Sequence, residues 1–150
     1  MEGRTVYMLE VKKRKELLTQ IVDLSPENAS ISFEGELKGV LVPKYLISAD
    51  AIGLHKRNTL APRMDFWVFN LEKKTKEYLK ADFINRIGIA SNVIHVLMTH
   101  QESYLFASYY HFASGMVQLF QSDFFSKETV LQLVKAGIVA GFEEVILPAS

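Results

Sequence analysis

The sequence predicts an α+β domain in which an antiparallel β-sheet carries two or three helices on one face. Strand-like segments follow one another directly, most clearly over residues 92–121, where we expect a meander of three strands. Helix-like segments are few and do not alternate regularly with strands, as a doubly wound parallel sheet would require. The 10 Phe and 6 Tyr residues favour sheet structure and large packing contacts.

The first half of the chain contains one predicted helix among strands. Runs of β-branched and aromatic residues predict strands over residues 5–11 and 65–71, and two short strands over 31–42 that join near Gly35. A helix is predicted over residues 12–24, because its apolar residues recur at helical spacing. That apolar stripe consists of Leu17, Leu18, Ile21 and Val22.

The second half contains one ambiguous segment followed by the meander. Apolar spacing predicts a helix over residues 79–87, whereas residues 72–78 fit either a helix or a hairpin. The meander is expected to turn near residues 101–103 and 113–115. If the first turn has three residues, the strand that follows it extends through residue 112.

The C-terminal segment predicts a last helix and a short strand. Ser126 is suited to the N-cap, and Gly137 or Gly141 is suited to the position after the last turn. Residues 145–147 predict a short strand. The helix face expected to pack on the sheet consists of Val130, Leu131, Val134 and Ile138.

Composition limits the classes of partner and compartment. Lys plus Arg and Asp plus Glu both number 17, so the chain lacks the basic excess of a typical nucleic-acid-binding protein, and we expect no nucleic-acid partner. There is no Cys, and no apolar run is long enough to span a bilayer. We therefore expect one cytoplasmic domain over residues 1–150, with no membrane contact and no cofactor.

Three histidines in the meander are the best candidates for chemistry. With a three-residue turn, His95 and His111 share one face of the sheet, and His100 lies on the other. Two imidazoles on one face could bind a metal ion or take part in acid–base catalysis. Histidines flanked by apolar residues are more often half-buried packing residues, which is the interpretation we favour.

The segment 43–63 is the longest stretch without a regular pattern, and it holds a basic cluster. Its basic side chains could bind a phosphate or an acidic partner, because an Arg guanidinium can hold such a group with two hydrogen bonds. A solvated loop is the alternative. The candidate binding residues of this cluster are His55, Arg57 and Arg63.

The aromatic residues of the meander point to a protein interface. Aromatics occupy both alternating sets of positions over residues 104–112, so both faces of the sheet could be apolar while helices cover one. Tyrosines are enriched at protein interfaces, and zero net charge offers no repulsion between copies. We expect a protein partner, or a homodimer, centred on Tyr104, Phe106, Tyr109 and Tyr110.

The preferred functional hypothesis is a non-catalytic protein-interaction module that uses an aromatic sheet face or edge. A small inhibitor, an immunity-like protein, an adaptor or a complex subunit would fit, because no phosphate-binding glycine loop, HExxH or GxSxG motif occurs. The alternative is a small-molecule-binding protein or enzyme with a histidine-based acid–base or metal site on the 93–112 hairpin. Such a site leaves no linear motif.

Overall fold

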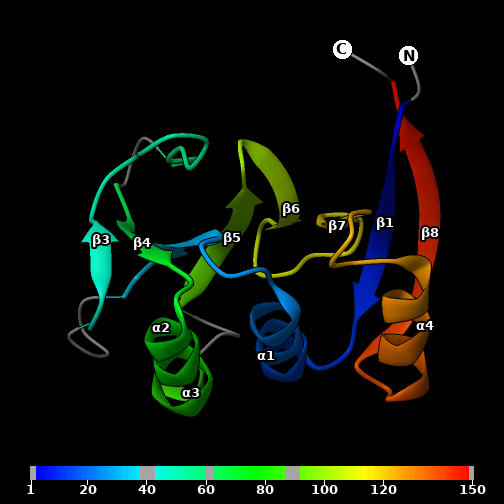
Figure 1. The fold of residues 1–150 in the computed structure, drawn as a ribbon, viewed down its shortest axis with the longest axis horizontal. Helices are drawn as coiled ribbons and strands as arrows, with labels where there is room; N and C mark the ends of the chain where they lie inside the picture. The colour runs from blue at the N-terminus through cyan, green and yellow to red at the C-terminus, as the bar shows by residue number, and fades with distance from the viewer. Residues whose placement is uncertain (1–2, 38–42, 60–62, 87–91, 149–150) are drawn as a thin grey trace.

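A computed structural model describes residues 3–37, 43–59, 63–86 and 92–148, and it confirms the predicted α+β fold. Figure 1 shows one antiparallel sheet with the helices on a single side of it. The strand order across the eight-stranded sheet is β3-β4-β2-β5-β6-β7-β1-β8. In chain order the elements are β1 (Arg4–Val11), α1 (Arg14–Leu24), β2 (Ser30–Gly35), β3 (Leu46–Ser48), β4 (Asp65–Asn70), α2 (Lys73–Tyr78), the π-helical turn η1 (Leu79–Phe83), α3 (Ile84–Arg86), β5 (Val93–His100), β6 (Ser103–Ser108), β7 (Val117–Phe120), α4 (Lys127–Lys135) and β8 (Val139–Leu147).

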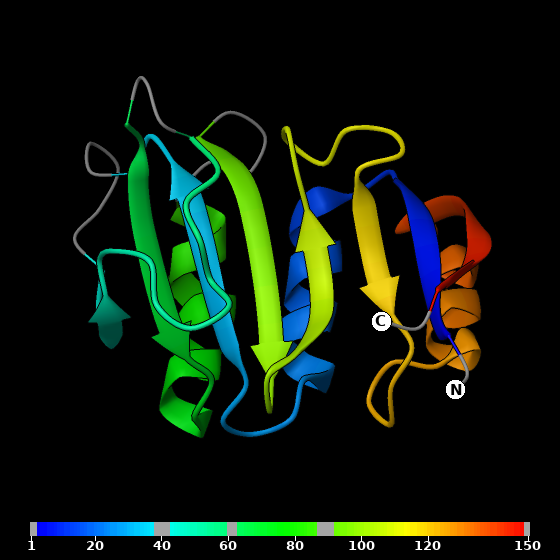
Figure 2. The same ribbon diagram turned by 90° about the horizontal axis from the view of Figure 1, so that it is seen from above.

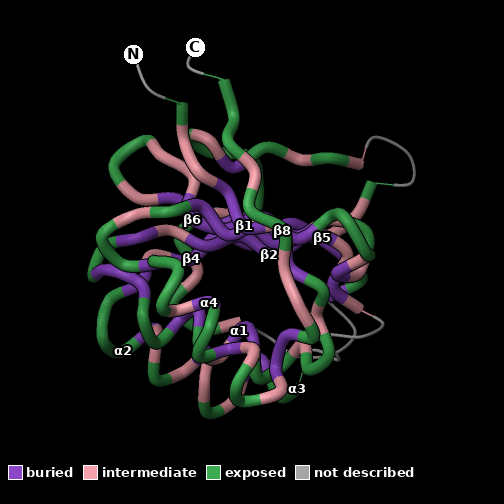
Figure 3. Tube along the Cα trace, turned by 90° about the vertical axis from the view of Figure 1, so that its right-hand side faces the viewer, coloured by how far each residue is buried: buried purple, intermediate pink, exposed green. Residues whose placement is uncertain are grey.

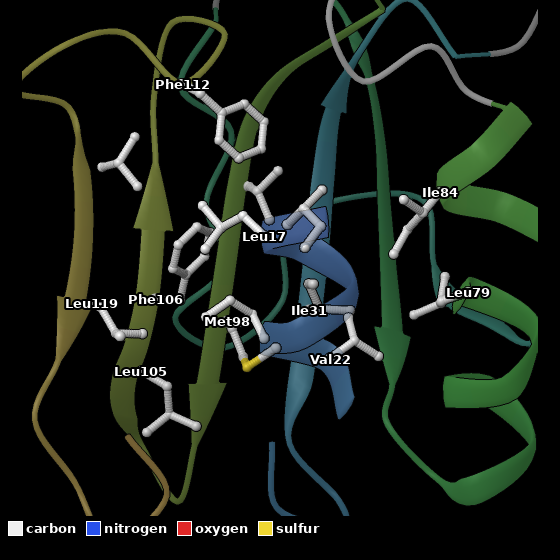
Figure 4. Packing of buried hydrophobic residues seen from close by; sticks show 14 of the residues in the cluster. Leu17, Val22, Ile31, Leu79, Ile84, Met98, Leu105, Phe106, Phe112 and Leu119 are labelled. Carbon is white, nitrogen blue, oxygen red and sulfur yellow. The ribbon is translucent and has the colours of Figure 1, made fainter. Parts of the chain in front are cut away.

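The first helix forms as its apolar spacing predicts. The four predicted stripe residues of α1 are fully buried, and Figure 4 shows Leu17 and Val22 packed against Ile31 and Met98 of the sheet. Figure 3 shows the same division along the chain, with buried residues running through the sheet and exposed ones on the outer sides of the helices. The core therefore lies between the sheet and the helical layer.

The ambiguous segment is helical throughout its described part. Residues from Lys73 to Arg86 form α2, η1 and α3 without a hairpin. Phe83 anchors them, because its ring lies 4.9 Å from that of Phe33 and 5.1 Å from that of Phe69. Such aromatic pairs stabilise a fold beyond the area that they bury.

The meander forms, but two of its predicted boundaries are wrong. The first turn has two residues, Gln101 and Glu102, both with positive φ, as in a type I′ hairpin turn. The strand that follows ends at Ser108 instead of residue 112, because three consecutive residues from Tyr110 to Phe112 have φ between 52° and 60°. Left-handed backbone cannot continue a strand.

The other boundaries follow the sequence in part. The segment 31–42 gives β2, while residues 38–42 lie outside the described ranges. The irregular segment 43–63 contains the short strand β3. The last strand, β8, is longer than predicted, with nine residues of which eight have a partner in β1.

The last helix packs most of its predicted face on the core, because Val130 and Ile138 are buried and Val134 is partly buried against them. Val130 and Leu133 are buried, whereas Leu131 is 45% exposed, so its assignment to the packed face is wrong. Gly137, with a φ of +74°, follows the helix as expected for a residue in the left-handed conformation. Ser126 caps the first turn by accepting a hydrogen bond from the amide of Thr129.

The chain connects the two ends of the sheet in an unusual order. The first strand, β1, lies between β7 and β8, and α1 then leads to β2 on the far side of β5. Figure 2 shows β1 beside the last strands of the chain, with both termini at the same end of the molecule. Both neighbours of β1 therefore come from residues 117–147.

Candidate functional site

The sheet face opposite the helices, here called the outer face, is covered in part by the loop of residues 49–59. Figure 2 shows this loop in front of the sheet, on the side away from the helices. The hydroxyl of Tyr104 donates a 3.2 Å hydrogen bond to the carbonyl of Leu54 and ties the loop to β6. A tight turn with paired backbone hydrogen bonds between Ile52 and His55 gives the loop its own structure, and Gly53 takes the positive φ that this turn requires.

His55 fastens the loop to the sheet. Its Nδ1 lies 2.7 Å from the hydroxyl of Ser32, and its Nε2 lies 2.9 Å from the hydroxyl of Thr99. A neutral imidazole donates through one nitrogen and accepts through the other, so both hydroxyls are satisfied. Burial, with 3% of the residue exposed, lowers the pKa of His55 to about 4. The ring is therefore neutral at pH 7 and fully engaged.

A second buried polar group lies beside it on the outer face. The carboxylate of Glu34 is buried and accepts hydrogen bonds from the amide of Asn58 at 3.1 Å and the hydroxyl of Thr59 at 2.9 Å. The Nε2 of His95 lies 3.9 Å from this carboxylate. Burial lowers the pKa of His95, and the nearby Glu34 opposes that shift. These contacts bind the end of the loop to β2.

His95 and His111 come close together, although His111 lies in the connection after β6 and not in a strand. The charge of a protonated His111 contributes to the lowered pKa of His95. The Nδ1 of His95 accepts a 3.4 Å hydrogen bond from the amide of Tyr110. Across the described residues, no group of three or more His, Asp or Glu side chains has the spacing to hold a metal ion. A histidine-based site on this hairpin stays a prediction.

The basic residues of the loop are held by the protein itself. The guanidinium of Arg57 donates to Asp50 at 2.8 Å and to the carbonyls of Ala49 and Met64. Arg63 also lies 3.2 Å from Asp50. The hydrogen bond from Arg57 lowers the pKa of the Asp50 carboxyl. The structure thus brings Arg57 and Arg63 together around the carboxylate of Asp50 in the same segment.

A pocket of about 510 Å³ opens where the loop, β3 and the β5–β6 turn meet. Its wall is apolar and includes Ile47, Ile52 and Val68, while His55 and Thr99 supply buried polar groups. This volume lies within the range of pockets that bind small molecules. Its polar rim consists of Asn28, Ser30, His100, Gln101 and Glu102.

The structure separates the four candidate aromatic residues. Phe106 lies in the core beneath the helices with none of its surface exposed, so it offers no contact to a partner (Figure 4). Tyr104 and Tyr109 pack on the small apolar cluster of the outer face. Tyr110 is 62% exposed in the connection after β6. Three of the four therefore lie on or beside the outer face, and Tyr110 is the most accessible.

The strand β8 forms one edge of the sheet. It pairs with β1 on one side, and no described strand pairs with its other side. Near the end of the strand, Ile146 is 70% exposed and Leu147 is 37% exposed. The strand contains no Lys, Arg or Pro, the residues that commonly protect sheet edges from pairing.

The hydrogen bonding of β1 shows which backbone groups of β8 face the open edge. The carbonyl of Thr5 accepts a 2.9 Å hydrogen bond from the amide of Gln121, so the backbone groups of Thr5 point away from β8. Successive residues of a strand point to opposite sides, so Val6 points toward β8 and its partner Val145 points back. By the same alternation, the residues whose N–H and C=O groups face the open edge are Phe142, Glu144 and Ile146.

Comparison with protein-family models, with curated proteins and with solved structures found no match to this chain. Within the described residues, no helix combines the length and apolar character needed to cross a bilayer. The candidate site is therefore defined by the geometry of the chain alone.

Sequence reasoning missed most of the residues that make up the outer-face site. Ser32, Glu34 and Thr99 read as ordinary strand residues, and their partners lie 23 to 44 positions away in the chain. One feature of the sequence could have drawn attention to this site, and it lies in the β5–β6 turn. A two-residue hairpin turn favours Asn-Gly, and the presence of Gln101-Glu102 departs from that preference.

Proposed function

We propose that this protein is a non-catalytic protein-interaction module that accepts an extended segment of a partner protein along the open edge of β8. The observation that carries the proposal is a nine-residue edge strand whose outer side pairs with no described strand and whose end carries exposed apolar side chains. Strand addition to such an edge is a common mode of peptide recognition, in which backbone hydrogen bonds supply affinity and side-chain contacts supply specificity.

The charges on the edge favour a basic partner segment. Glu143 and Glu144 are adjacent, so their side chains project to opposite faces of the sheet. Lys127 lies 3.9 Å from Glu144, and both side chains are about half exposed. An incoming strand with Lys or Arg opposite these positions would gain a cross-strand ion pair on each face.

Self-association through the same edge is a second candidate. Antiparallel pairing of two β8 strands places glutamates opposite one another when the two-fold axis lies at Glu143 or Glu144, and like charges in that position are destabilising. A register centred on Val145 instead pairs each glutamate with Ile146 or Leu147. The homodimer and the cytoplasmic location expected from the sequence stay proposals, to be tested by sedimentation and by cell fractionation.

The test of strand addition uses an Ile146→Pro variant. Proline removes the amide of Ile146, which faces the open edge, while the hydrogen bonds to β1 come from the neighbouring residues. The matched control is Ile47→Pro, which places the same change in β3 at the opposite edge of the sheet. Thermal unfolding of both variants shows whether the fold is retained.

Tagged protein recovered from its native host, followed by mass spectrometry, gives the readout. We expect a stoichiometric partner with the original chain and with Ile47→Pro, and its loss with Ile146→Pro. A synthetic segment of that partner should then slow amide hydrogen exchange at Phe142, Glu144 and Ile146. Retention of the partner by a folded Ile146→Pro variant, or the absence of any stoichiometric partner, would refute the proposal.

A further inference from the structure

The pocket between the 49–59 loop and the β5–β6 turn has polar groups that the protein leaves unused. The side chains of Asn28, Ser30, Gln101 and Glu102 make no hydrogen bond to another residue in the described ranges. The polar groups deeper in the pocket differ, because His55 and Thr99 bond to each other. The rim therefore presents free donors and acceptors around an apolar wall, the usual composition of a small-ligand site.

The backbone at the rim adopts conformations that its residues do not favour. Gln101 and Glu102 have φ of 50° and 61°. Glycine or asparagine fills such positions at little cost, whereas glutamine and glutamate do not. The strain at this turn is stored beside the pocket, which is where departures from local preference commonly serve a function.

The charges of the lining define the kind of ligand. The described residues that line the pocket include no Lys or Arg, and Glu102 is the one carboxylate among them. An anionic ligand would meet that carboxylate without a compensating cation, whereas an ammonium group would be attracted to it. The wall of Ile47, Ile52 and Val68 would bury an aromatic or branched alkyl body.

We propose that this pocket binds a small amphiphilic amine, with its ammonium group at Glu102 and its apolar body against Ile47, Ile52 and Val68. The neutral side chains of Asn28, Ser30 and Gln101 accept or donate hydrogen bonds at the rim. The site lies on β2–β5 and the loop, apart from the β8 edge, so it is independent of strand addition there.

Two probes that share one ring and one chain length test the charge preference. Tryptamine and indole-3-propionate both carry an indole on a two-carbon chain, and they end in an ammonium and a carboxylate respectively. Titration of ¹⁵N-labelled protein, followed by amide chemical shifts, should move the signals of Gly53, Thr99, Gln101 and Glu102 together. We expect tryptamine to bind about tenfold more tightly than indole-3-propionate.

Two variants separate the contributions of charge and apolar contact. Glu102→Gln keeps the length and hydrogen bonding of the side chain, and it should remove most of the preference for tryptamine. Ile47→Ala should weaken both probes. Glu143→Gln on β8 is the control, and it should leave both affinities unchanged because it removes the same charge at a distant site.

Three results would overturn the proposal. These are equal affinity for the two probes, a preference for tryptamine that survives Glu102→Gln in the folded variant, and no saturable shift at up to about 10 mM probe. Partner capture through β8 would be unaffected by any of them, so this proposal and the one for the edge strand can fail separately.

Discussion

Acidification from pH 7 to pH 5 should destabilise the protein through His55. Burial lowers the pKa of this imidazole from 6.5 to about 4, so the folded protein keeps the ring neutral where the unfolded chain would protonate it. The unfolded state binds more protons between these two pKa values. The free energy of unfolding therefore falls as the pH drops below 6.5, and the loss is complete near pH 4.

The size of this effect follows from the two pKa values. At pH 7 the imidazole is mostly neutral in both states and contributes little. At pH 5 it is almost fully protonated in the unfolded chain and about nine-tenths neutral in the folded protein, which amounts to roughly 2 kcal/mol of lost stability. A protonated ring would also need to donate through both nitrogens, which disturbs the bonds to Ser32 and Thr99.

Urea unfolding followed by the fluorescence of Trp67, the single and buried tryptophan, measures this effect. A His55→Gln variant should be less stable at pH 7 by about 1–3 kcal/mol, because the hydroxyls of Ser32 and Thr99 lose their partners. On going to pH 5, however, the variant should lose roughly 2 kcal/mol less of its unfolding free energy than the original chain. Ser32→Ala, which keeps the imidazole, should be destabilised but retain the pH dependence of the original chain. Equal pH dependence in the original chain and His55→Gln would show that His55 is not the titrating group.

Four further variants test the packing and the turn. Leu17→Ala in the core should cost about 2–5 kcal/mol in urea unfolding, whereas Leu131→Ala should cost less than about 1 kcal/mol, and a larger loss would place Leu131 in the core after all. Gly35→Ala should cost about 1–3 kcal/mol or prevent folding, because its Cβ would lie 1.9 Å from the carbonyl oxygen of Asn92; unchanged thermal stability would contradict that close approach. The double change Gln101→Asn and Glu102→Gly should raise the unfolding free energy by about 1–2 kcal/mol while weakening tryptamine binding, and a destabilised variant would mean that the turn is not type I′.

The sequence predicts the fold where one local pattern decides the outcome. The apolar stripe of α1 has helical spacing, and all four of its residues are buried, namely Leu17, Leu18, Ile21 and Val22. The end of β6 could not be predicted in this way, because Tyr110 and Phe112 have strong β propensity and still adopt left-handed backbone, as does His111 between them. Tertiary contacts decide there, including the bond from the amide of His111 to the carbonyl of Ile94.

The candidate site was predictable only in its components. The sequence singles out His55 and Arg57 within an irregular segment, but their charge suggests an anion site. In the fold, His55 is neutral and bonded to two strands, and Arg57 is held by Asp50. Hydrogen bonds between residues so far apart in the chain depend on the register of the sheet. A one-residue error in the length of the β5–β6 turn changes that register, and the predicted neighbours are then wrong.

The position of β1 between β7 and β8 has a consequence for synthesis. The ribosome delivers β1 first, but both strands that pair with it come from the last third of the chain. Until residues 117–147 emerge, the apolar side chains of Val6, Tyr7 and Leu9 have no sheet to join. Pairing between segments so far apart in the sequence is slow, and such exposed strands are prone to aggregate. A nascent chain stalled before β7 is therefore the form in which we expect the strongest binding to chaperones.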